Sequence, residues 1–133
     1  MFDHTGIVVT DLSKARPFYD AVARALGLGI VTPHKDFFLL GRGPGQLPYL
    51  WIGTLRPSYW VQGSRPGINQ MHVAFVAKDK AMVDEFHRAA LAAGGRDNGQ
   101  PGPRQGTENY YGAFVLDPDG YNIEAVCHRP QPS

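Results

Sequence analysis

Two histidines and one glutamate stand where they could act together on a bound metal ion. His4 and His72 each open a β-branched, apolar stretch, and Glu124 lies in another such stretch near the end of the chain. Two imidazoles and a carboxylate make up a facial triad, which binds Fe(II), Mn(II) or a similar ion and leaves other coordination positions open. A carboxylate among apolar neighbours such as Ile123 and Ala125 is costly unless it is paired or ligated. Taken alone, either histidine could instead cap a strand or form an ordinary hydrogen bond.

An internal repeat relates these positions to one another. A shift of 68 positions brings seven identical residues into register over 24 positions without a gap, from His4 on His72 to Gly27 on Gly95. Repeats of this kind indicate duplicated structural units. When the last strands of the two halves are aligned, Tyr49–Ile52 lies over Asn122–Ala125 and the partner of Glu124 is Trp51.

The elements that must position these residues follow one order in both halves. Each half is predicted to begin with a strand and a helix and to continue with three strands. We expect helices from Ser13, as N-cap, to Gly27 and from near Asp79 to Gly94-Gly95. The expected strands are His4–Val9, Leu28–Thr32, Phe37–Leu40, Tyr49–Thr54, Met71–Val76, a weak one near Gly95–Asp97, Ala113–Leu116 and Tyr121–Cys127. The predicted fold class is α+β, with βαβββ modules at about 1–54 and 70–128 of a single domain over residues 1–133.

Three connecting segments complete this prediction. Asp117-Pro118-Asp119-Gly120 has the composition of a hairpin turn. Leu55–Asn69 and Asn98–Tyr110 are rich in Gly, Pro and polar residues and are expected to be loops. Long loops in compact domains often carry binding residues.

The composition narrows the function classes. The chain has 133 residues, 43% hydrophobic and 19% charged, which is typical of a globular domain. A net charge of +1 without a run of Lys or Arg argues against a nucleic-acid partner. No apolar stretch approaches the roughly 20 residues of a membrane span, and no leader segment is visible. The single cysteine, Cys127, is expected to be a small buried hydrophobe, and its lack of a partner fits the reducing cytoplasm.

The motifs that surround these residues resemble those of a known family. Asp3–Leu12, followed by Phe18-Tyr19 and Gly27, resembles the opening of the vicinal oxygen chelate superfamily, which includes glyoxalase I, extradiol dioxygenases and bleomycin-resistance proteins. Met71–Phe75 and Phe114–Glu124 are similar to its second-half signatures. The resemblance implies paired βαβββ modules that form a curved mixed sheet around a cleft, in a homodimer. It does not indicate whether the modules pair within a chain or across the dimer.

The same resemblance implies a ligand set. The family's metal ligands map onto His4, His72 and Glu124, and its fourth ligand, commonly Glu, Gln or His, maps onto Trp51. Because glyoxalase I uses that carboxylate for proton transfer, Trp51 argues against a lactoylglutathione lyase. The remaining three ligands are similar to the set of extradiol dioxygenases. The implied cofactor is a divalent ion, which could be Fe, Mn, Ni, Co or Zn.

Two functions follow as hypotheses. The first is a metal-dependent lyase, isomerase or dioxygenase that acts on a small oxygen-chelating substrate. Its base could be Glu108, Tyr110, Tyr111 or metal-bound hydroxide. The second is a metal-free, bleomycin-resistance-like protein that binds an aromatic or cationic molecule by stacking. The residues expected to line the cleft are Trp51, Tyr49, Phe38 and Arg104, with Trp60 and Tyr111 as further stacking surfaces. Arg104 and Glu108 could contact an anionic substrate or simply be solvated. His34 and His87 are expected at the surface, and His128 is either near the site or at a frayed end.

Overall fold

The structure is a computed structural model that describes residues 1–66, 71–104 and 107–128. Its first half forms one four-stranded sheet and one helix. In this sheet the strand order is β1-β4-β3-β2, with β1 parallel to β4 and the other neighbours antiparallel. The elements are β1 (His4–Val8), α1 (Leu12–Ala25), β2 (Gly29–Pro33), β3 (Phe37–Gly41) and β4 (Tyr49–Gly53).

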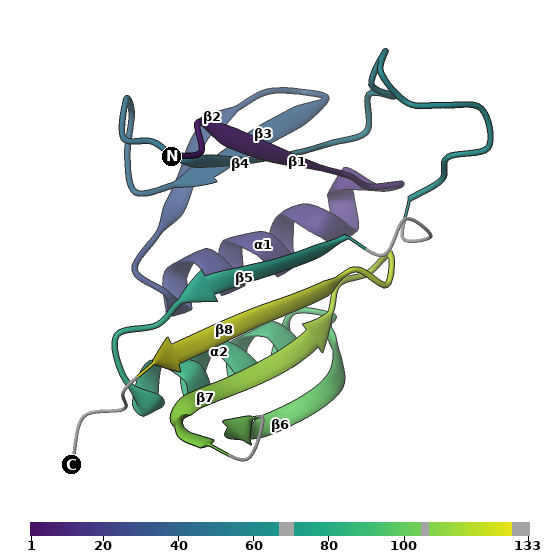
Figure 1. The fold of residues 1–133 in the computed structure, drawn as a ribbon. Helices are drawn as coiled ribbons and strands as arrows, with labels where there is room; N and C mark the ends of the chain where they lie inside the picture. The colour runs from purple at the N-terminus through teal and green to yellow at the C-terminus, as the bar shows by residue number, and fades with distance from the viewer. Residues whose placement is uncertain (67–70, 105–106, 129–133) are drawn as a thin grey trace.

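The second half repeats this topology. Its sheet has the order β5-β8-β7-β6, again with one parallel pair, β5 and β8, beside antiparallel neighbours. Figure 1 shows the two sheets as separate layers, with α1 between the first sheet and β5. The fold is therefore α+β with paired βαβββ modules, as predicted. The elements are β5 (His72–Val76), α2 (Lys80–Ala92), β6 (Arg96–Arg104), β7 (Thr107–Leu116) and β8 (Asn122–His128).

Both helices begin at an aspartate. The Asp11 carboxylate accepts from the backbone N of Ser13 at 2.8 Å, so the N-cap of α1 lies two residues before the predicted Ser13. Asp79 accepts from the backbone N of Met82 at 2.8 Å and caps α2. An aspartate carboxylate satisfies the backbone donors that the first helical turn leaves free. Neither helix in the described part of the chain is long and apolar enough to cross a membrane.

In the segment Asn98–Tyr110, predicted as a loop, the described residues form most of β6 and the beginning of β7 instead, and these strands pair with each other. The prediction was wrong because Gly99, Pro101, Gly102 and Pro103 are residue types that strands usually exclude. They are accommodated because β6 lies at the edge of the sheet and its register with β7 shifts at several irregularities. Edge strands tolerate proline and bulges, since one side of the strand needs no ladder partners.

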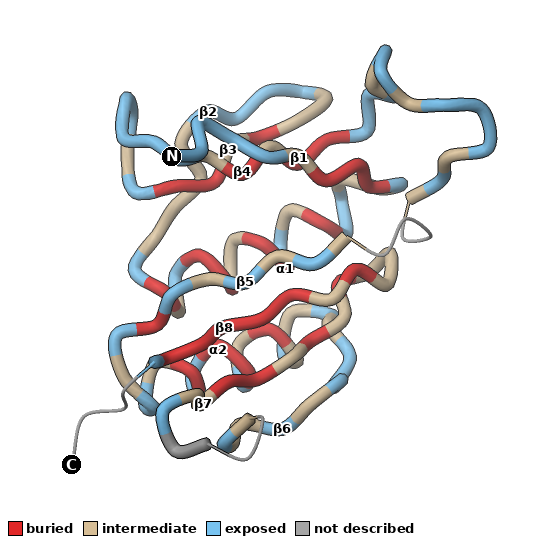
Figure 2. The backbone as a smooth tube through the Cα atoms, viewed as in Figure 1, coloured by how far each residue is buried: buried red, intermediate tan, exposed pale blue. Residues whose placement is uncertain are grey.

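The core lies between each sheet and its helix. Figure 2 shows buried backbone along α1, α2 and β8, and Phe18, Phe86 and Ile123 are fully buried. His87 is also buried, 6% exposed, although it was expected at the surface. Its Nε2 lies 2.9 Å from Asp97 Oδ1, so α2 turns this histidine toward the start of β6 rather than toward solvent.

A turn of the second module is bonded to the first module. The turn at 117–120 has Gly120 at φ +94° and a hydrogen bond from the Gly120 N to the Asp117 carbonyl, as its composition predicted. Asp117 accepts from the Tyr19 hydroxyl at 2.5 Å, and Asp119 accepts from the Thr10 hydroxyl at 2.7 Å. The Tyr121 hydroxyl, just beyond this turn, donates to the Val8 carbonyl at 2.7 Å. We call these contacts the module seam.

Candidate functional site

Glu124 is a buried carboxylate on the face of the second sheet that points away from α2. Side chains alternate along a strand, so Ile123 and Ala125 face the helix and Glu124 faces the opposite way. Glu124 is nevertheless only 1% exposed. It lies between Ala74 of β5 and Phe114 of β7 in the strand register. Gly112 provides space beside it, because a Cβ at that position would lie 3.1 Å from Glu124 Oε2.

Two side chains contact the Glu124 carboxylate. His72 Nε2 lies 3.1 Å from Oε1, and the Tyr110 hydroxyl donates to Oε2 at 2.5 Å. This hydrogen bond raises the pKa of Tyr110 to about 12, with burial as the next cause. Tyr110 is therefore a protonated donor at neutral pH. Among the described residues, no Lys or Arg forms an ion pair with Glu124. The buried carboxylate thus lacks a permanently cationic partner.

Two asparagines hold the far side of the His72 ring. The Asn122 amide lies 2.9 Å from His72 Nδ1, and Asn98 Nδ2 donates to Asn122 Oδ1 at 2.9 Å. The Asn122 backbone carbonyl is 3.3 Å from the same ring nitrogen. We did not predict either asparagine. The available signal was that Asn122 precedes Glu124 by two residues and so shares its face of β8.

The equivalent face of the first sheet is aromatic. The register pairs Gly6 with Trp51 where the second sheet pairs Ala74 with Glu124, so the two residues occupy equivalent positions. The Trp51 ring lies against Gly53, where a Cβ would come within 2.6 Å of it. It stacks on Phe37 at 5.8 Å between ring centroids, and Phe37 stacks on His34 at 4.6 Å. We call His34, Phe37 and Trp51 the aromatic row.

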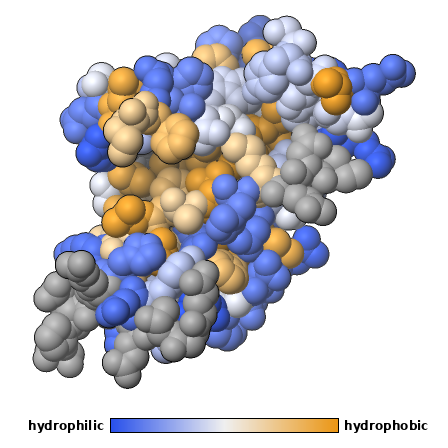
Figure 3. Space-filling model, viewed as in Figure 1, coloured by the Kyte–Doolittle hydropathy of each residue, from blue (hydrophilic) through white to orange (hydrophobic). Residues whose placement is uncertain are grey.

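His4 stands apart from the His72–Glu124 pair. Its side chain is exposed, and its Nδ1 lies 2.6 Å from Asp3 Oδ1. In the regions that the structure describes, no three His, Cys, Asp or Glu side chains come together as a metal-binding group. Both histidines do line one hollow of about 900 Å³ between the modules. Its wall is largely apolar, as Figure 3 shows, and includes Leu26, Leu28, Leu50, Met71 and Phe75.

The residues predicted to line the cleft or act as base are spread over several environments. Phe38 is fully buried beside Tyr19 on the helix side of the first sheet, so it offers no surface to a ligand. The Tyr111 hydroxyl donates to Asp84 of α2 at 2.7 Å and points away from Glu124; burial, more than this bond, raises the pKa of Tyr111 to about 12. Tyr49 lines the hollow between the modules. Glu108 falls in β7, but its side chain lies outside the described part of the structure.

Three further candidates lie near or away from the Glu124 face. Arg104 is placed over the Phe114 ring, with its guanidinium carbon 4.8 Å from the ring centroid. His128 is exposed, and its ring is 5.0 Å from that of Tyr110. Trp60 lies in the segment between the modules, where the Arg56 guanidinium covers its ring at 5.3 Å.

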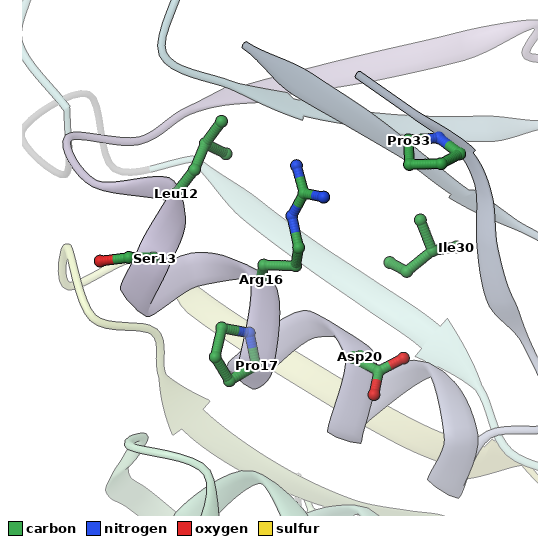
Figure 4. Close-up of a pocket in the computed structure, with 7 residues that line it drawn as sticks. All are labelled: Leu12, Ser13, Arg16, Pro17, Asp20, Ile30 and Pro33. Carbon is green, nitrogen blue, oxygen red and sulfur yellow. The ribbon is translucent and has the colours of Figure 1, made fainter. Parts of the chain in front are cut away.

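A second hollow, of about 660 Å³, lies between α1 and the first sheet and contains none of the predicted site residues. Figure 4 shows Arg16 extending from α1 toward that sheet, where it donates to the His34 carbonyl at 2.9 Å. The hollow offers one cation, Arg16, which uses one donor on the His34 carbonyl, and one carboxylate, Asp20, which forms an ion pair with Arg24. Its lining residues are Leu12, Ser13, Arg16, Pro17, Asp20, Ile30 and Pro33.

Comparisons with a family model, with other sequences and with solved structures all find glyoxalase-type proteins. Residues 1–125 match the family model described as the Glyoxalase/Bleomycin resistance protein/Dioxygenase superfamily. A probable lactoylglutathione lyase of Vibrio cholerae is 30% identical, over 95% of this chain and 89% of that protein. A putative lactoylglutathione lyase of Brassica oleracea is 29% identical over 98% of this chain, which spans only 45% of that longer protein. The crystal structure of a glyoxalase/bleomycin resistance protein from Albidiferax ferrireducens is 31% identical, with a TM-score of 0.76 over 98% of this chain and 99% of that one.

Proposed function

Starting from the fact that this chain belongs to the glyoxalase/bleomycin resistance protein/dioxygenase superfamily, we propose that it is a divalent-metal-dependent enzyme. Its reaction would be of the lyase, isomerase or dioxygenase type, on a small substrate that chelates the metal through two oxygens. The observation that supports this most directly is the buried Glu124 carboxylate, whose side-chain partners are an imidazole and a phenol. Burial of a charge is costly unless it is paired or ligated, and a divalent cation would supply the missing positive charge.

The donor set on the second sheet suits such an ion. His72 Nε2 and Glu124 Oε1 are 3.1 Å apart, and imidazole nitrogen with carboxylate oxygen is a common ligand combination for Fe, Mn, Co, Ni and Zn. Coordination through Nε2 needs the ring proton on Nδ1. The Asn122 backbone carbonyl, 3.3 Å from Nδ1, could accept this proton, but the Asn122 side-chain Nδ2 lies 2.9 Å from the same nitrogen and would have to turn away when the metal binds. The third ligand would be His4. When bound, the ion would polarise the substrate oxygens as a Lewis acid or provide an oxygen-activating centre.

The residues around these ligands limit the chemistry. Tyr110 would hold the free oxygen of Glu124 and act as a donor rather than a base, because its pKa is about 12. Trp51 supplies no fourth ligand and no carboxylate base. Tyr111 faces α2, which leaves Glu108 or metal-bound hydroxide as the proposed base. The names of the curated relatives favour a lyase, but a lyase built on this chain would need a base at a position other than 51.

We further propose that the complete site forms in a homodimer. Within the described chain, β1 pairs only with β4 and β5 only with β8, so both strands present an unpaired edge. Unpaired edges are ready-made surfaces for pairing with another strand. If β1 of one copy lies beside β5 of the other, His4 approaches His72 and Glu124 across the interface. Cys127 is buried and forms no disulfide, which is consistent with a protein that functions in the reducing cytoplasm.

The second candidate function is a metal-free binding protein, and the aromatic row favours it. His34, Phe37 and Trp51 present stacked rings on one face of the first sheet. Such a surface suits a planar aromatic or cationic ligand. This function requires neither His72 nor Glu124, and it predicts ligand binding that a chelator leaves unchanged.

Metal analysis of protein purified without a His tag separates the two functions. We expect near-stoichiometric Fe, Mn, Ni, Co or Zn in the wild type. We expect at least about a tenfold weaker affinity for that metal in His72→Ala and Glu124→Gln. His34→Ala is the matched control, since it removes an exposed imidazole from the other module and should retain the metal. If the wild type takes up no metal even after reconstitution, the enzyme proposal fails and the binding protein remains.

A further inference from the structure

Arg104 is a cation for which the described chain provides no anion. No Asp or Glu of the described residues lies within ion-pair distance of its guanidinium. Its protein acceptor is the Gln100 carbonyl, which takes one hydrogen bond from Nη2. Its Nε is buried without any hydrogen-bond partner. A guanidinium carries five donor hydrogens in a fixed plane, and buried polar groups are nearly always satisfied. Among the described residues, the Gln100 carbonyl is the acceptor for this guanidinium, so its other terminal donors are open to solvent or to a ligand.

The guanidinium lies on the same face of the sheet as Glu124. Gly99, Phe114 and Glu124 form one row across β6, β7 and β8, so their side-chain positions share a face. A Cβ at Gly99 would lie 3.0 Å from Arg104 Nη2 and 2.9 Å from the Phe114 ring. The absence of a side chain at Gly99 thus creates the space that the guanidinium occupies above Phe114.

Phe114 connects this cation to the proposed metal ligands. Its ring is 4.8 Å from the guanidinium carbon of Arg104 and 6.3 Å from the His72 ring, measured between centroids. Phe114 is also the strand neighbour of Glu124. An apolar ring therefore separates a carboxylate–imidazole pair on one side from an unpaired cation on the other. Two strand spacings, about 10 Å, separate β8 from β6.

We propose that Arg104 binds a carboxylate of the substrate, while the two chelating oxygens of the same molecule lie at His72 and Glu124. This inference rests on the proposed metal-dependent function and specifies its substrate class. The substrate is an organic anion with chelating oxygens at one end and a carboxylate at the other, across an apolar middle that contacts Phe114. Arginine suits this role because its planar fork matches the two oxygens of a carboxylate.

A purely structural role for Arg104 makes different predictions. Its contacts with Phe114 and Gln100 could simply hold the end of β6 in place. In that case the loss of the guanidinium would lower stability but would not change which ligands bind. The tests therefore compare ligands that differ only in a carboxylate.

The first test uses metal-free protein and follows the Arg104 Nε–H signal by NMR. We expect benzoate to shift this signal saturably and benzamide, its uncharged counterpart, to leave it unchanged. Arg104→Lys, which has no Nε–H, assigns the signal. No saturable shift with benzoate would overturn the inference, whether or not the protein binds metal. Because this test needs no metal, a failure of the proposed enzyme function does not affect it.

The second test uses Mn²⁺-loaded protein and two hydroxamates, which chelate metals through two oxygens. We expect the wild type to bind 4-carboxybenzohydroxamate at least about tenfold more tightly than benzohydroxamate, as expected for a charge-assisted hydrogen bond. Arg104→Gln should abolish this preference and leave the affinity for benzohydroxamate within about twofold.

Arg96→Gln, at the exposed start of the same strand, is the matched control and should keep the preference. Equal affinities in the wild type, or a preference that survives in Arg104→Gln, would overturn the assignment of Arg104 to the substrate. If no Mn²⁺ loads, the proposed enzyme function fails, and the benzoate titration alone decides whether Arg104 binds anions.

Discussion

Single residues on the two open sheet faces depend on glycines beside them. Glu124 fits because Gly112 has no side chain, and the Trp51 ring fits because Gly53 has none. Each of these glycines lies on the same sheet face as the residue it accommodates, two residues along β4 for Gly53 and on the neighbouring strand for Gly112. A large side chain at either glycine would displace the functional group without touching any ligand. The equivalent positions 51 and 124 therefore carry an aromatic ring in the first module and a carboxylate in the second.

The His87–Asp97 pair predicts that the free energy of unfolding decreases at acid pH. Hydrogen bonds from His87 and from the Gly99 backbone hold the pKa of Asp97 below its ordinary value of 3.8. A carboxyl with a lowered folded-state pKa contributes stability that is complete above the unfolded pKa and is lost as the pH falls through the folded one. We expect Asp97→Asn to have a lower free energy of unfolding than the wild type at pH 7. This difference in free energy should become smaller below about pH 4.

Urea unfolding at about pH 7 and pH 3 measures this difference. Asp20→Asn is the control, because Asp20 forms an i,i+4 ion pair with the exposed Arg24 and should change stability little at either pH. The expectation would be contradicted if the free energies of unfolding of Asp97→Asn and the wild type differed by the same amount at both pH values.

The sequence predicted His72 and Glu124 as neighbours but did not predict their surroundings. They were grouped because His4 and His72 are equivalent in the repeat and because the ligand set implied by the resemblance maps onto both of them and Glu124. Tyr110 was a candidate, but its bond to Glu124 depends on the register of β7 against β8, which no local pattern encodes. The burial of His87 was missed for a similar reason, since its partner Asp97 lies on another element.

Among the elements, the helices and most strands followed from periodicity, while β6 did not. Apolar residues at helical spacing marked α1 and α2, and β-branched or apolar runs marked the central strands. The edge strand β6 is rich in Gly and Pro and is held by its neighbour β7 and by α2 rather than by its own propensity. Tertiary contacts outweigh local preference at such an edge.

The junction between α2 and β6 requires a glycine at position 95. A Cβ there would lie 2.4 Å from Val115 Cγ1, 2.7 Å from the Phe18 ring and 2.8 Å from the Ala90 carbonyl. We expect Gly95→Ala to lower the free energy of unfolding by about 1–3 kcal/mol through overpacking. Gly29→Ala in β2, where nothing lies within 4 Å, should change it by less than about 0.5 kcal/mol. Chemical denaturation of both variants provides the measurement, and equal losses would refute the packing argument.

For the molecule as a whole, the repeat predicted two similar modules but not how copies of the chain combine. The edges of β1 and β5 are unpaired in the described chain, and His4 lies away from Glu124. Whether a strand edge pairs with another copy depends on surfaces that no periodic pattern records. The assembly must therefore be tested directly.

Mixing two inactive variants tests whether the proposed metal site is shared between copies. His4→Ala and Glu124→Gln should each bind little metal alone. In a symmetric dimer, a mixed pair regains one intact site, with His4 from one copy and His72 with Glu124 from the other. After random exchange we expect about one quarter of the wild-type metal content. A mixture that binds no more metal than the separate variants would show that each site lies within one chain.

The module seam has a consequence for the integrity of the chain. Bonds from Tyr19 to Asp117, from Thr10 to Asp119 and from Tyr121 to Val8 join the two modules without using the segment between β4 and β5. The covalent connection is therefore not the only link that holds the halves in register. A chain cut near Gly63 would yield two fragments that still carry matching surfaces, and these fragments should reassemble when they are expressed together. The protein could then be used as a split reporter, because its two fragments would fold only when they associate.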